Sequence, residues 1–173
     1  NFVIVDKTGD IGWYPYSKIP KRAWASQALP PWLPLPGDGS AEWDGFVPMS
    51  DLPQLTNPPG GAIATANADM TGANADGDLL NDGQAAMQAF SKADGTREQR
   101  ILDLLAAGGD THTVDPLTDI QGDTYSLYGS FVTPLVLAAA SGATLTPAEK
   151  DVVDALADWQ FRCPTGLDGA DPK

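Results

Sequence analysis

The sequence has few basic residues and therefore a strong excess of negative charge. Its 173 residues contain 10 Lys and Arg against 23 Asp and Glu, which gives a net charge of -13 and a pI of about 4.1. Nucleic acids and anionic membranes attract positive charge, so this composition argues against both as partners. It suits a soluble protein, and acidic clusters of this kind can hold calcium.

Cysteine and histidine occur once each. Cys163 cannot form an internal disulfide and has no histidine near it to activate it, so we expect a half-buried structural thiol. His112 lies in the polar run GGDTHTVD, where a solvated loop residue is expected rather than a general base. The sequence also lacks G-x-S-x-G, a P-loop, zinc-ligand spacing and a glycine-rich dinucleotide turn, so no organic cofactor is expected.

Long apolar runs are missing as well. No stretch is long enough to cross a bilayer, and no basic-then-apolar signal segment opens the chain. Asn1 stands directly before FVIV without a starting Met. We therefore expect that the chain is cut out of a longer polypeptide.

The first half has the pattern of a partial β-sheet with irregular wrapping. The stretch 2–14 predicts a hairpin around DKTGD, and 62–67, AIATAN, predicts a short strand. Proline crowds 15–59 and rules out long regular elements there. Yet this stretch carries large apolar side chains, so we expect an ordered layer over the sheet. These are Trp24, Trp32, Leu33, Leu35, Trp43, Phe46 and Leu52.

The second half is predicted to be helical, with three capping boxes in which Thr is followed three residues later by Gln or Glu. The boxes begin at Thr96, Thr118 and Thr146, and Pro134 should kink the second of these helices. The sequence thus predicts an α+β fold in one incomplete domain. Its parts are 1–67 with the sheet and proline-rich layer, 68–95 with an Asp/Gly-rich loop and short helix, and 96–173 with the helices.

The loop after the predicted strand is a candidate calcium site. It contains Asp76, Asp78 and Asp82, but an EF-hand counted from Asp76 needs a glutamate where Met87 stands. An EF-hand is therefore excluded. A calcium site with ligands from distant segments and a solvated acidic turn both stay open.

Six motifs follow one another along the chain up to about Trp159: NFVIVDKTGDIGWY, SKIPKR, LPLPGDGSAEWDGFVP, LPQLTNPPGGAIATAN, REQRILDLL and IQGDTYS. In this order they resemble the β-subunit of penicillin acylases, in the N-terminal nucleophile hydrolase superfamily. The resemblance implies that the chain is a fragment of an αββα fold. It also implies an amide hydrolase whose freed N-terminal serine, after autocatalytic processing, forms an acyl-enzyme with its own amino group as base.

The resemblance assigns roles to two residues of this chain. Asn67 matches the asparagine that, with a backbone amide, donates to the oxyanion. Arg97 matches an arginine near the nucleophile that orients the amino terminus and the asparagine. On chemistry alone, Asn67 could simply end a strand in an Asx-type turn and Arg97 could be a solvated helix residue.

The resemblance also implies a structural calcium ion. The carbonyl of Pro31 matches one family ligand, and an acidic ligand comes from the loop holding Asp76, Asp78 and Asp82. That loop differs in length here, so the three aspartates are not distinguished.

The chain departs from the family pattern at the catalytic centre. The nucleophilic serine is absent, since the chain begins with Asn1, and the strand supplying the backbone amide is absent too. Ala68 and Asp69 follow Asn67, where many members carry a second asparagine or a similar polar residue. We expect the isolated chain to be inactive. Its expected partners are the remaining α- and β-subunit segments and a small N-acylated substrate: penicillin, cephalosporin, acyl-homoserine lactone or lipopeptide.

Two other expectations follow from the same reasoning. The family is usually exported, so a periplasmic or secreted location is expected. An incomplete sheet leaves strand edges uncovered, so self-association of the chain is also expected. The alternative to an enzyme fragment is a non-catalytic binding or calcium-dependent structural module on the same fold.

Overall fold

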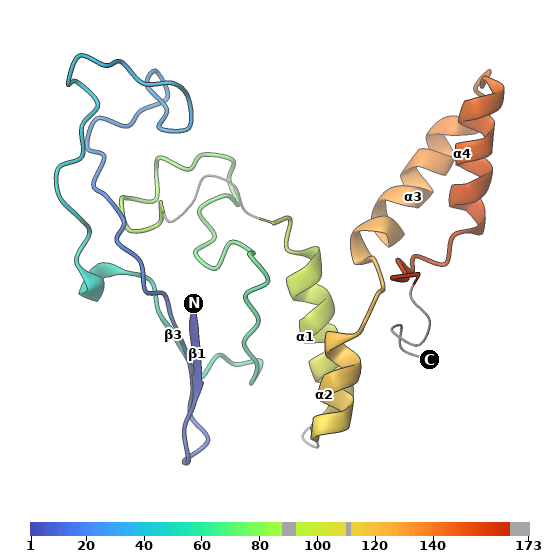
Figure 1. The fold of residues 1–173 in the computed structure, drawn as a ribbon, viewed down its shortest axis with the longest axis horizontal. Helices are drawn as coiled ribbons and strands as arrows, with labels where there is room; N and C mark the ends of the chain where they lie inside the picture. Colours follow the sequence, from blue (N-terminus) through green and yellow to red (C-terminus); the bar gives the residue numbers. More distant parts are fainter. Residues whose placement is uncertain (88–92, 110–111, 167–173) are drawn as a thin grey trace. The chain divides into compact units, whose positions relative to one another are not determined.

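The structure, a computed structural model, describes residues 1–87, 93–109 and 112–166 (Figure 1). The chain divides into two compact units, Asn1–Gly95 and Thr96–Lys173, which are described separately below. The described part of the first unit holds a three-stranded antiparallel sheet, and that of the second holds four α-helices. The predicted α+β class is therefore confirmed.

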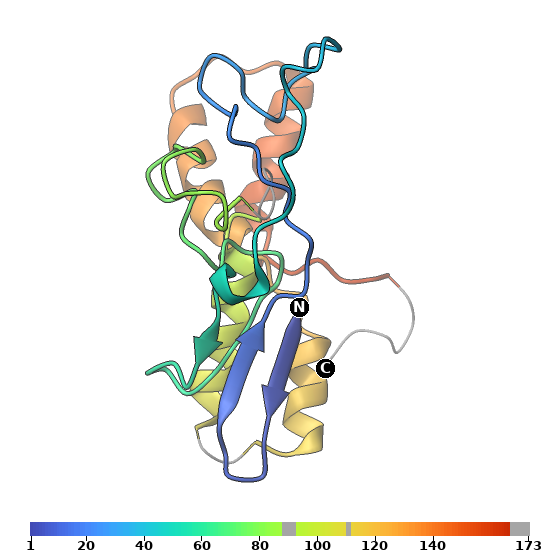
Figure 2. The same cartoon turned by 90° about the vertical axis from the view of Figure 1, so that its left-hand side faces the viewer.

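The predicted hairpin is present. β1 (Phe2–Val5) pairs with β2 (Ile11–Tyr14), with Phe2 opposite Tyr14 and Val5 opposite Ile11 (Figure 2). The Asp6 carboxylate closes the turn by accepting hydrogen bonds from the amides of Thr8 at 2.8 Å and Asp10 at 3.1 Å. Gly9 has a φ of 93°, a left-handed conformation that costs glycine nothing.

The predicted strand over 62–67 is wrong. The third strand, β3 (Leu55–Thr56), pairs with β2 instead, and 62–67 contains no strand. The stretch 62–67 ends in a tight turn, and its small side chains let the backbone pack closely, with Ala64 and Ala68 buried. The short apolar run therefore packs closely without pairing in the sheet.

Asn57 fixes the end of β3 against the hairpin. Its amide donates to the Ile11 carbonyl at 2.9 Å, and its side-chain Oδ1 accepts from the Ile11 amide at 2.8 Å. Its Nδ2 also donates to Asp10 Oδ1 at 2.7 Å. The Asn57 side chain thus continues the β2–β3 ladder by one further bond.

The proline-rich segment is ordered, as predicted, but most of its large apolar side chains are not covered. Its two arms pair through Val47 N and the Ile19 carbonyl at 2.8 Å, and through a bridge between Pro20 and Phe46. Ile19, Val47 and Leu52 form a small buried cluster next to Ala85. Five of the predicted packing residues are instead exposed: Trp32, Leu33, Leu35, Trp43 and Phe46.

Trp13 is the largest fully buried side chain among the described residues. It lies in the central strand β2, opposite Val3 of β1 and Leu55 of β3. Its indole Nε1 donates to Asn1 Oδ1 at 2.8 Å. The buried indole N–H is therefore satisfied, and the first residue is tied to the sheet.

The second unit contains α1 (Thr96–Gly108), α2 (Val114–Gln121), α3 (Leu127–Ala140) and α4 (Pro147–Asp158). α3 and α4 run side by side, and α1 contacts both α2 and α3 (Figure 1). α3 continues through Pro134. No helix among the residues described has the length and apolar character needed to cross a bilayer.

One of the three predicted capping boxes forms as expected. At α4, Thr146 Oγ1 accepts from the Glu149 amide at 3.3 Å and Glu149 Oε2 accepts from the Thr146 amide at 2.8 Å. The box predicted at Thr118 is wrong, because Thr118 lies inside α2 and bonds to the Val114 carbonyl. Ser126 caps the next helix instead.

The box predicted at Thr96 is also not formed in full. Thr96 begins α1, but Gln99 Nε2 donates forward to Asp103 Oδ1 at 2.7 Å rather than reaching back. The short helix predicted within 68–95 stays a prediction, since 88–92 lie outside the described residues. The residues before them, 83–87, form hydrogen-bonded turns.

Candidate active site

Asn67 occupies the second central position of a tight turn. Ala66 and Asn67 have φ angles of 36° and 60°, and the Ala68 amide donates to the Thr65 carbonyl at 2.6 Å. Two consecutive positive φ values with this hydrogen bond are the signature of a type I′ turn. Asparagine and glycine favour such turns, whereas an alanine there is strained because its Cβ crowds the backbone.

The rest of the Asn67 backbone is also fixed. Its carbonyl accepts a hydrogen bond from the Ala93 amide at 2.9 Å. The following residues are held by the Asp69 carboxylate, which accepts from the amides of Thr71 at 3.2 Å and Asn74 at 2.7 Å. The backbone on the C-terminal side of the turn is therefore held by hydrogen bonds.

The Asn67 side chain is exposed, and its carboxamide has no hydrogen-bond partner among the residues that the structure describes. An unengaged carboxamide offers two N–H donors and one acceptor. The turn therefore presents a carboxamide donor, unpartnered within the described residues, on a strained and anchored backbone. A carboxamide N–H is one of the donor types that oxyanion holes use.

Arg97 lies in the first turn of α1 and is exposed. It belongs to the second unit, whereas Asn67 belongs to the first. A cation in the first turn faces the positive end of the helix dipole, which is mildly unfavourable. Arg97 is therefore not placed there for the stability of α1.

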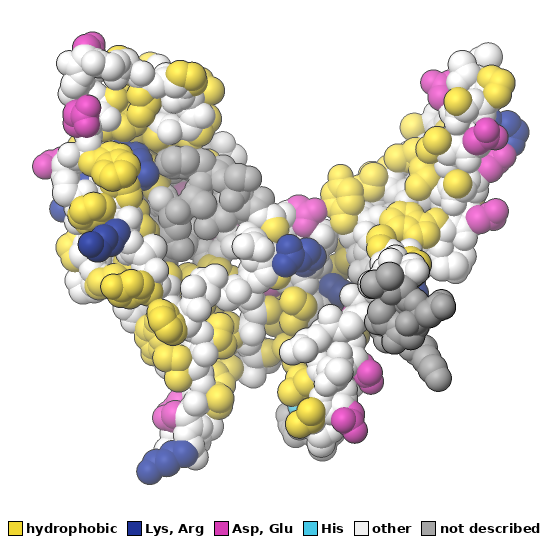
Figure 3. All heavy atoms as spheres, viewed as in Figure 1, with side chains coloured by type: hydrophobic (Ala, Val, Ile, Leu, Met, Phe, Trp, Pro, Cys, Tyr) yellow, Lys and Arg dark blue, Asp and Glu magenta, His cyan; other side chains and the backbone are white. Residues whose placement is uncertain are grey.

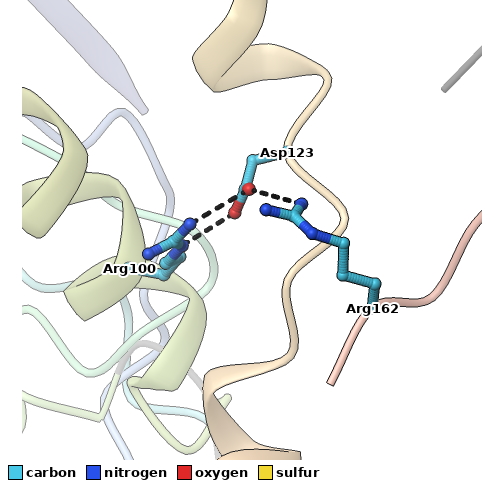
Figure 4. Close-up of polar contacts among 3 residues, drawn as sticks. All are labelled: Arg100, Asp123 and Arg162. Carbon is cyan, nitrogen blue, oxygen red and sulfur yellow. Dashed lines mark hydrogen bonds and ion pairs between the residues drawn. The ribbon is translucent and has the colours of Figure 1, made fainter. Parts of the chain in front are cut away.

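Arg100, one turn further along α1, belongs to a cluster of three charged side chains with Asp123, which precedes α3, and Arg162, which follows α4 (Figure 4). Arg100 Nε donates to Asp123 Oδ2 at 2.8 Å, and its second terminal nitrogen donates to Oδ1 at 3.1 Å. Arg162 approaches Asp123 Oδ1 at 3.5 Å. The hydrogen bond from Arg100 holds the pKa of Asp123 below its ordinary value, and the charge of Arg162 lowers it further.

Sequence reasoning missed this cluster. Arg100 and Asp123 are separated by 23 positions and Asp123 and Arg162 by 39, and no motif spacing connects them. One feature of the sequence pointed to such a cluster: Arg100 follows Arg97 by one helical turn. Two arginines on one side of a helix repel each other and favour a nearby carboxylate, but the sequence does not say which aspartate supplies it.

The candidate calcium residues have different hydrogen-bond partners. Asp78 Oδ1 accepts from Gln27 Nε2 at 2.9 Å, so this aspartate is tied to the turn segment that leads to Pro31. Asp76 accepts from Asn81 Nδ2 at 2.6 Å, and this bond lowers the pKa of Asp76. Asp82 is exposed. No three His, Cys, Asp or Glu side chains in the described part of the chain gather as a metal site.

The single histidine and cysteine take no part in these arrangements. His112 is not the solvated loop residue that was predicted, because its Nε2 lies 2.8 Å from the Leu105 carbonyl and its Nδ1 is buried. The ring therefore caps a carbonyl near the end of α1. Cys163 is exposed rather than half-buried, and its amide donates to the Thr124 carbonyl at 2.9 Å.

Comparison with known proteins identifies the family. Residues 1–171 match the penicillin amidase family. The chain is 29% identical to the penicillin acylase 2 proenzyme of Pseudomonas sp. (strain SE83) over 171 residues, which is 98% of this chain and 20% of that protein. It is 28% identical to penicillin G acylase of Escherichia coli over 161 residues, which is 92% of this chain and 18% of that protein.

The chain thus spans about a fifth of the length of these curated relatives. The match extends over both units, including the turn at Asn67 and the start of α1 at Arg97. The resemblance seen in the sequence motifs is therefore confirmed at the level of the family. The chain belongs to the penicillin amidase family.

Proposed function

We propose that the chain is part of a penicillin-acylase-type amidohydrolase that hydrolyses an N-acyl amide bond. Attack by an N-terminal serine, supplied by polypeptide outside this chain, would give an acyl-enzyme that water then cleaves. Family membership supports this reaction class, since both similar proteins above are named as acylases. The chain alone would be inactive.

The observation that carries the proposal is the strained turn at Asn67. Alanine at a φ of 36° costs roughly 1–2 kcal/mol. Such strain persists where the surroundings impose it, and it concentrates at functional sites. The unengaged Asn67 carboxamide would donate to the negative oxygen of the tetrahedral intermediate.

Arg97 would orient the amino terminus of the nucleophile. Its support is its position in the family match and its exposed, electrostatically unfavourable place at the start of α1. A guanidinium can donate to two acceptors in a fixed plane, which suits an orienting role.

The partners would be other segments of a longer polypeptide, together with a small N-acylated substrate. All four residues of β1 are exposed although all are apolar. α3 likewise exposes Tyr128, Phe131 and Leu135, and hydrophobic side chains gather along this helix (Figure 3). Exposed apolar surface and an unpaired strand edge of this kind are usually buried against another polypeptide segment. Export to the periplasm or cell exterior stays a prediction.

Calcium is proposed as a structural ion, with Pro31 and Asp78 as its ligands from this chain. The Gln27–Asp78 hydrogen bond supports this choice among the aspartates, because it holds Asp78 to the segment containing Pro31. Carbonyl and carboxylate oxygens are ligands that calcium prefers, and other ligands would come from outside the chain. The ion would link segments and would take no part in bond cleavage.

The enzymatic role is tested in the full-length polypeptide with Asn67→Gly. Glycine keeps the left-handed backbone and removes only the carboxamide. We expect kcat for amide hydrolysis to fall ~10²- to 10³-fold. Asn74→Ala, in the same loop, is the matched control and should leave the rate unchanged.

An unchanged kcat in Asn67→Gly would remove Asn67 from the mechanism. A full-length polypeptide that folds and binds N-acyl compounds without cleaving them would favour a non-catalytic binding module instead. Calcium is tested by thermal melting of the full-length polypeptide with and without a chelator. A midpoint that falls in the wild type but not in Asp78→Asn supports the assignment, and an unchanged wild-type midpoint would rule out the ion.

A further inference from the structure

We propose that Asp123 is a positioning residue for Arg97. Its carboxylate binds the side chain of Arg100, which lies one helical turn after Arg97 in α1. This contact fixes the rotation of α1 about its axis and so sets the direction in which the Arg97 side chain projects from the helix. This inference rests on the proposed function, in which Arg97 orients groups of the active site.

The contact between Arg100 and Asp123 is directional. Two nitrogens of the guanidinium meet two carboxylate oxygens at 2.8 and 3.1 Å (Figure 4). The Asp123 side chain is only 12% exposed, so water screens the pair less than it would at the surface. A two-point contact between planar groups fixes orientation as well as distance.

The other face of Arg100 is also held. Its guanidinium carbon lies 4.6 Å from the centre of the Tyr125 ring, a cation–π contact. Arg100 is therefore restrained by two residues of the same short connection between α2 and α3. A side chain restrained on two sides cannot easily swing away from this connection.

The connection itself is anchored to the segment after α4. The Ser126 amide donates to the Phe161 carbonyl at 2.6 Å, and the Cys163 amide donates to the Thr124 carbonyl at 2.9 Å. Tyr125 and Arg162 form an isolated antiparallel bridge, and Arg162 adds its charge to Asp123 at 3.5 Å. The segment that carries Asp123 is therefore itself held in place by hydrogen bonds while Asp123 binds Arg100.

The apolar face of α1 is only half-buried. None of its side chains is fully buried, and its large apolar side chains between positions 101 and 105 are each partly exposed. The Arg100–Asp123 pair adds to these apolar contacts a directional restraint on the roll of the helix about its axis. Residues three apart are neighbours on a helix, so fixing the roll at Arg100 fixes it at Arg97.

The proposal is tested by a double-mutant cycle in the full-length polypeptide, with kcat and KM measured for amide hydrolysis. Asp123→Asn should lower kcat by about 10- to 100-fold with little change in KM, because the orienting group is misplaced. In an Arg97→Ala background, the same Asp123→Asn change should cause no further loss. Asp123→Glu, which keeps the carboxylate, should recover part of the rate.

Two further variants serve as controls, one for the loss of an unrelated ion pair and one for misfolding. Asp154→Asn removes the exposed Lys150–Asp154 ion pair of α4 and should leave the rate unchanged. If Asp123→Asn does not fold, Arg100→Lys keeps the charge but loses the two-point contact, and the cycle is repeated with it.

Loss of equal size with and without the Arg97 side chain would show a merely structural role and overturn the proposal. If Arg97→Ala itself leaves kcat unchanged, the role of Arg97 in the proposed function is wrong and the proposal falls with it. The two failures are distinguished by that single variant.

Discussion

The indole of Trp159 lies directly over Gly129 of α3. A Cβ placed on Gly129 would stand 2.5 Å from Trp159 Cη2 and 2.6 Å from Cζ3. The ring is held in place, since its Nε1 donates to the Arg162 carbonyl at 2.8 Å and its edge contacts Phe161. Only glycine lets α3 and the segment after α4 approach this closely.

Gly129→Ala should therefore destabilise the chain by about 1–3 kcal/mol through overpacking. Chemical denaturation of the purified chain, followed by circular dichroism, measures this change. Gly37→Ala is the control, because its Cβ meets nothing within 4 Å and its φ is not positive. Equal stability of Gly129→Ala and wild type would show that Trp159 moves freely.

Asn57 should stabilise the sheet through both its side chain and its backbone conformation. Its φ is 46°, a conformation that glycine adopts without strain. Asn57→Gly therefore removes only the two side-chain bonds, to the Ile11 amide and to Asp10, at a cost of about 0.5–1.5 kcal/mol per bond. Asn57→Ala also forces alanine into the left-handed region and should cost roughly 1–2 kcal/mol more. Reversal of this order in denaturant unfolding would contradict the backbone argument.

Ala66 should tolerate glycine better than any larger residue. Ala66→Gly relieves the strain of a positive φ and should be neutral or stabilising by up to about 1 kcal/mol. Ala66→Val places a β-branched side chain in the same strained conformation and should be clearly destabilising. Thermal melting of the three forms checks the order, and a stable Ala66→Val would argue against the type I′ turn.

The contribution of Asp123 to stability should depend on pH. The hydrogen bond from Arg100 lowers the folded-state pKa of Asp123 below its ordinary value of 3.8. Its contribution is therefore complete above that value and is lost as the pH falls through the lower, folded-state pKa. We expect the difference in unfolding free energy between wild type and Asp123→Asn to shrink between neutral and strongly acidic pH. A difference independent of pH would contradict the ion pair.

Local signals were read correctly where neighbours in sequence decide the structure. The hairpin at 2–14 depends on a turn whose Asp6 and Gly9 act within a few residues. The capping box at Thr146 depends on Glu149 three positions later. Both could be predicted because the interacting groups lie within one turn of chain.

Errors arose where a distant partner decides the outcome. The stretch 62–67 is a short apolar run that was predicted to be a strand, yet β2 pairs with Leu55–Thr56, where Asn57 bonds to Ile11. Thr118 has the spacing of a cap but lies within α2, and Ser126 takes its role. Trp43 and Phe46 were expected to pack on the sheet but contact each other and are exposed.

The α+β class, the hairpin, the helical second half and the family could be predicted from the sequence, because these depend on turn chemistry, helical periodicity and ordered motifs. The strained turn of Ala66 and Asn67, whose carboxamide has no partner in the described part of the chain, and the contact of Asp123 with Arg100 became visible only in the folded chain. A backbone φ angle and an ion pair across 23 positions depend on how the chain is folded in space, which no local pattern encodes.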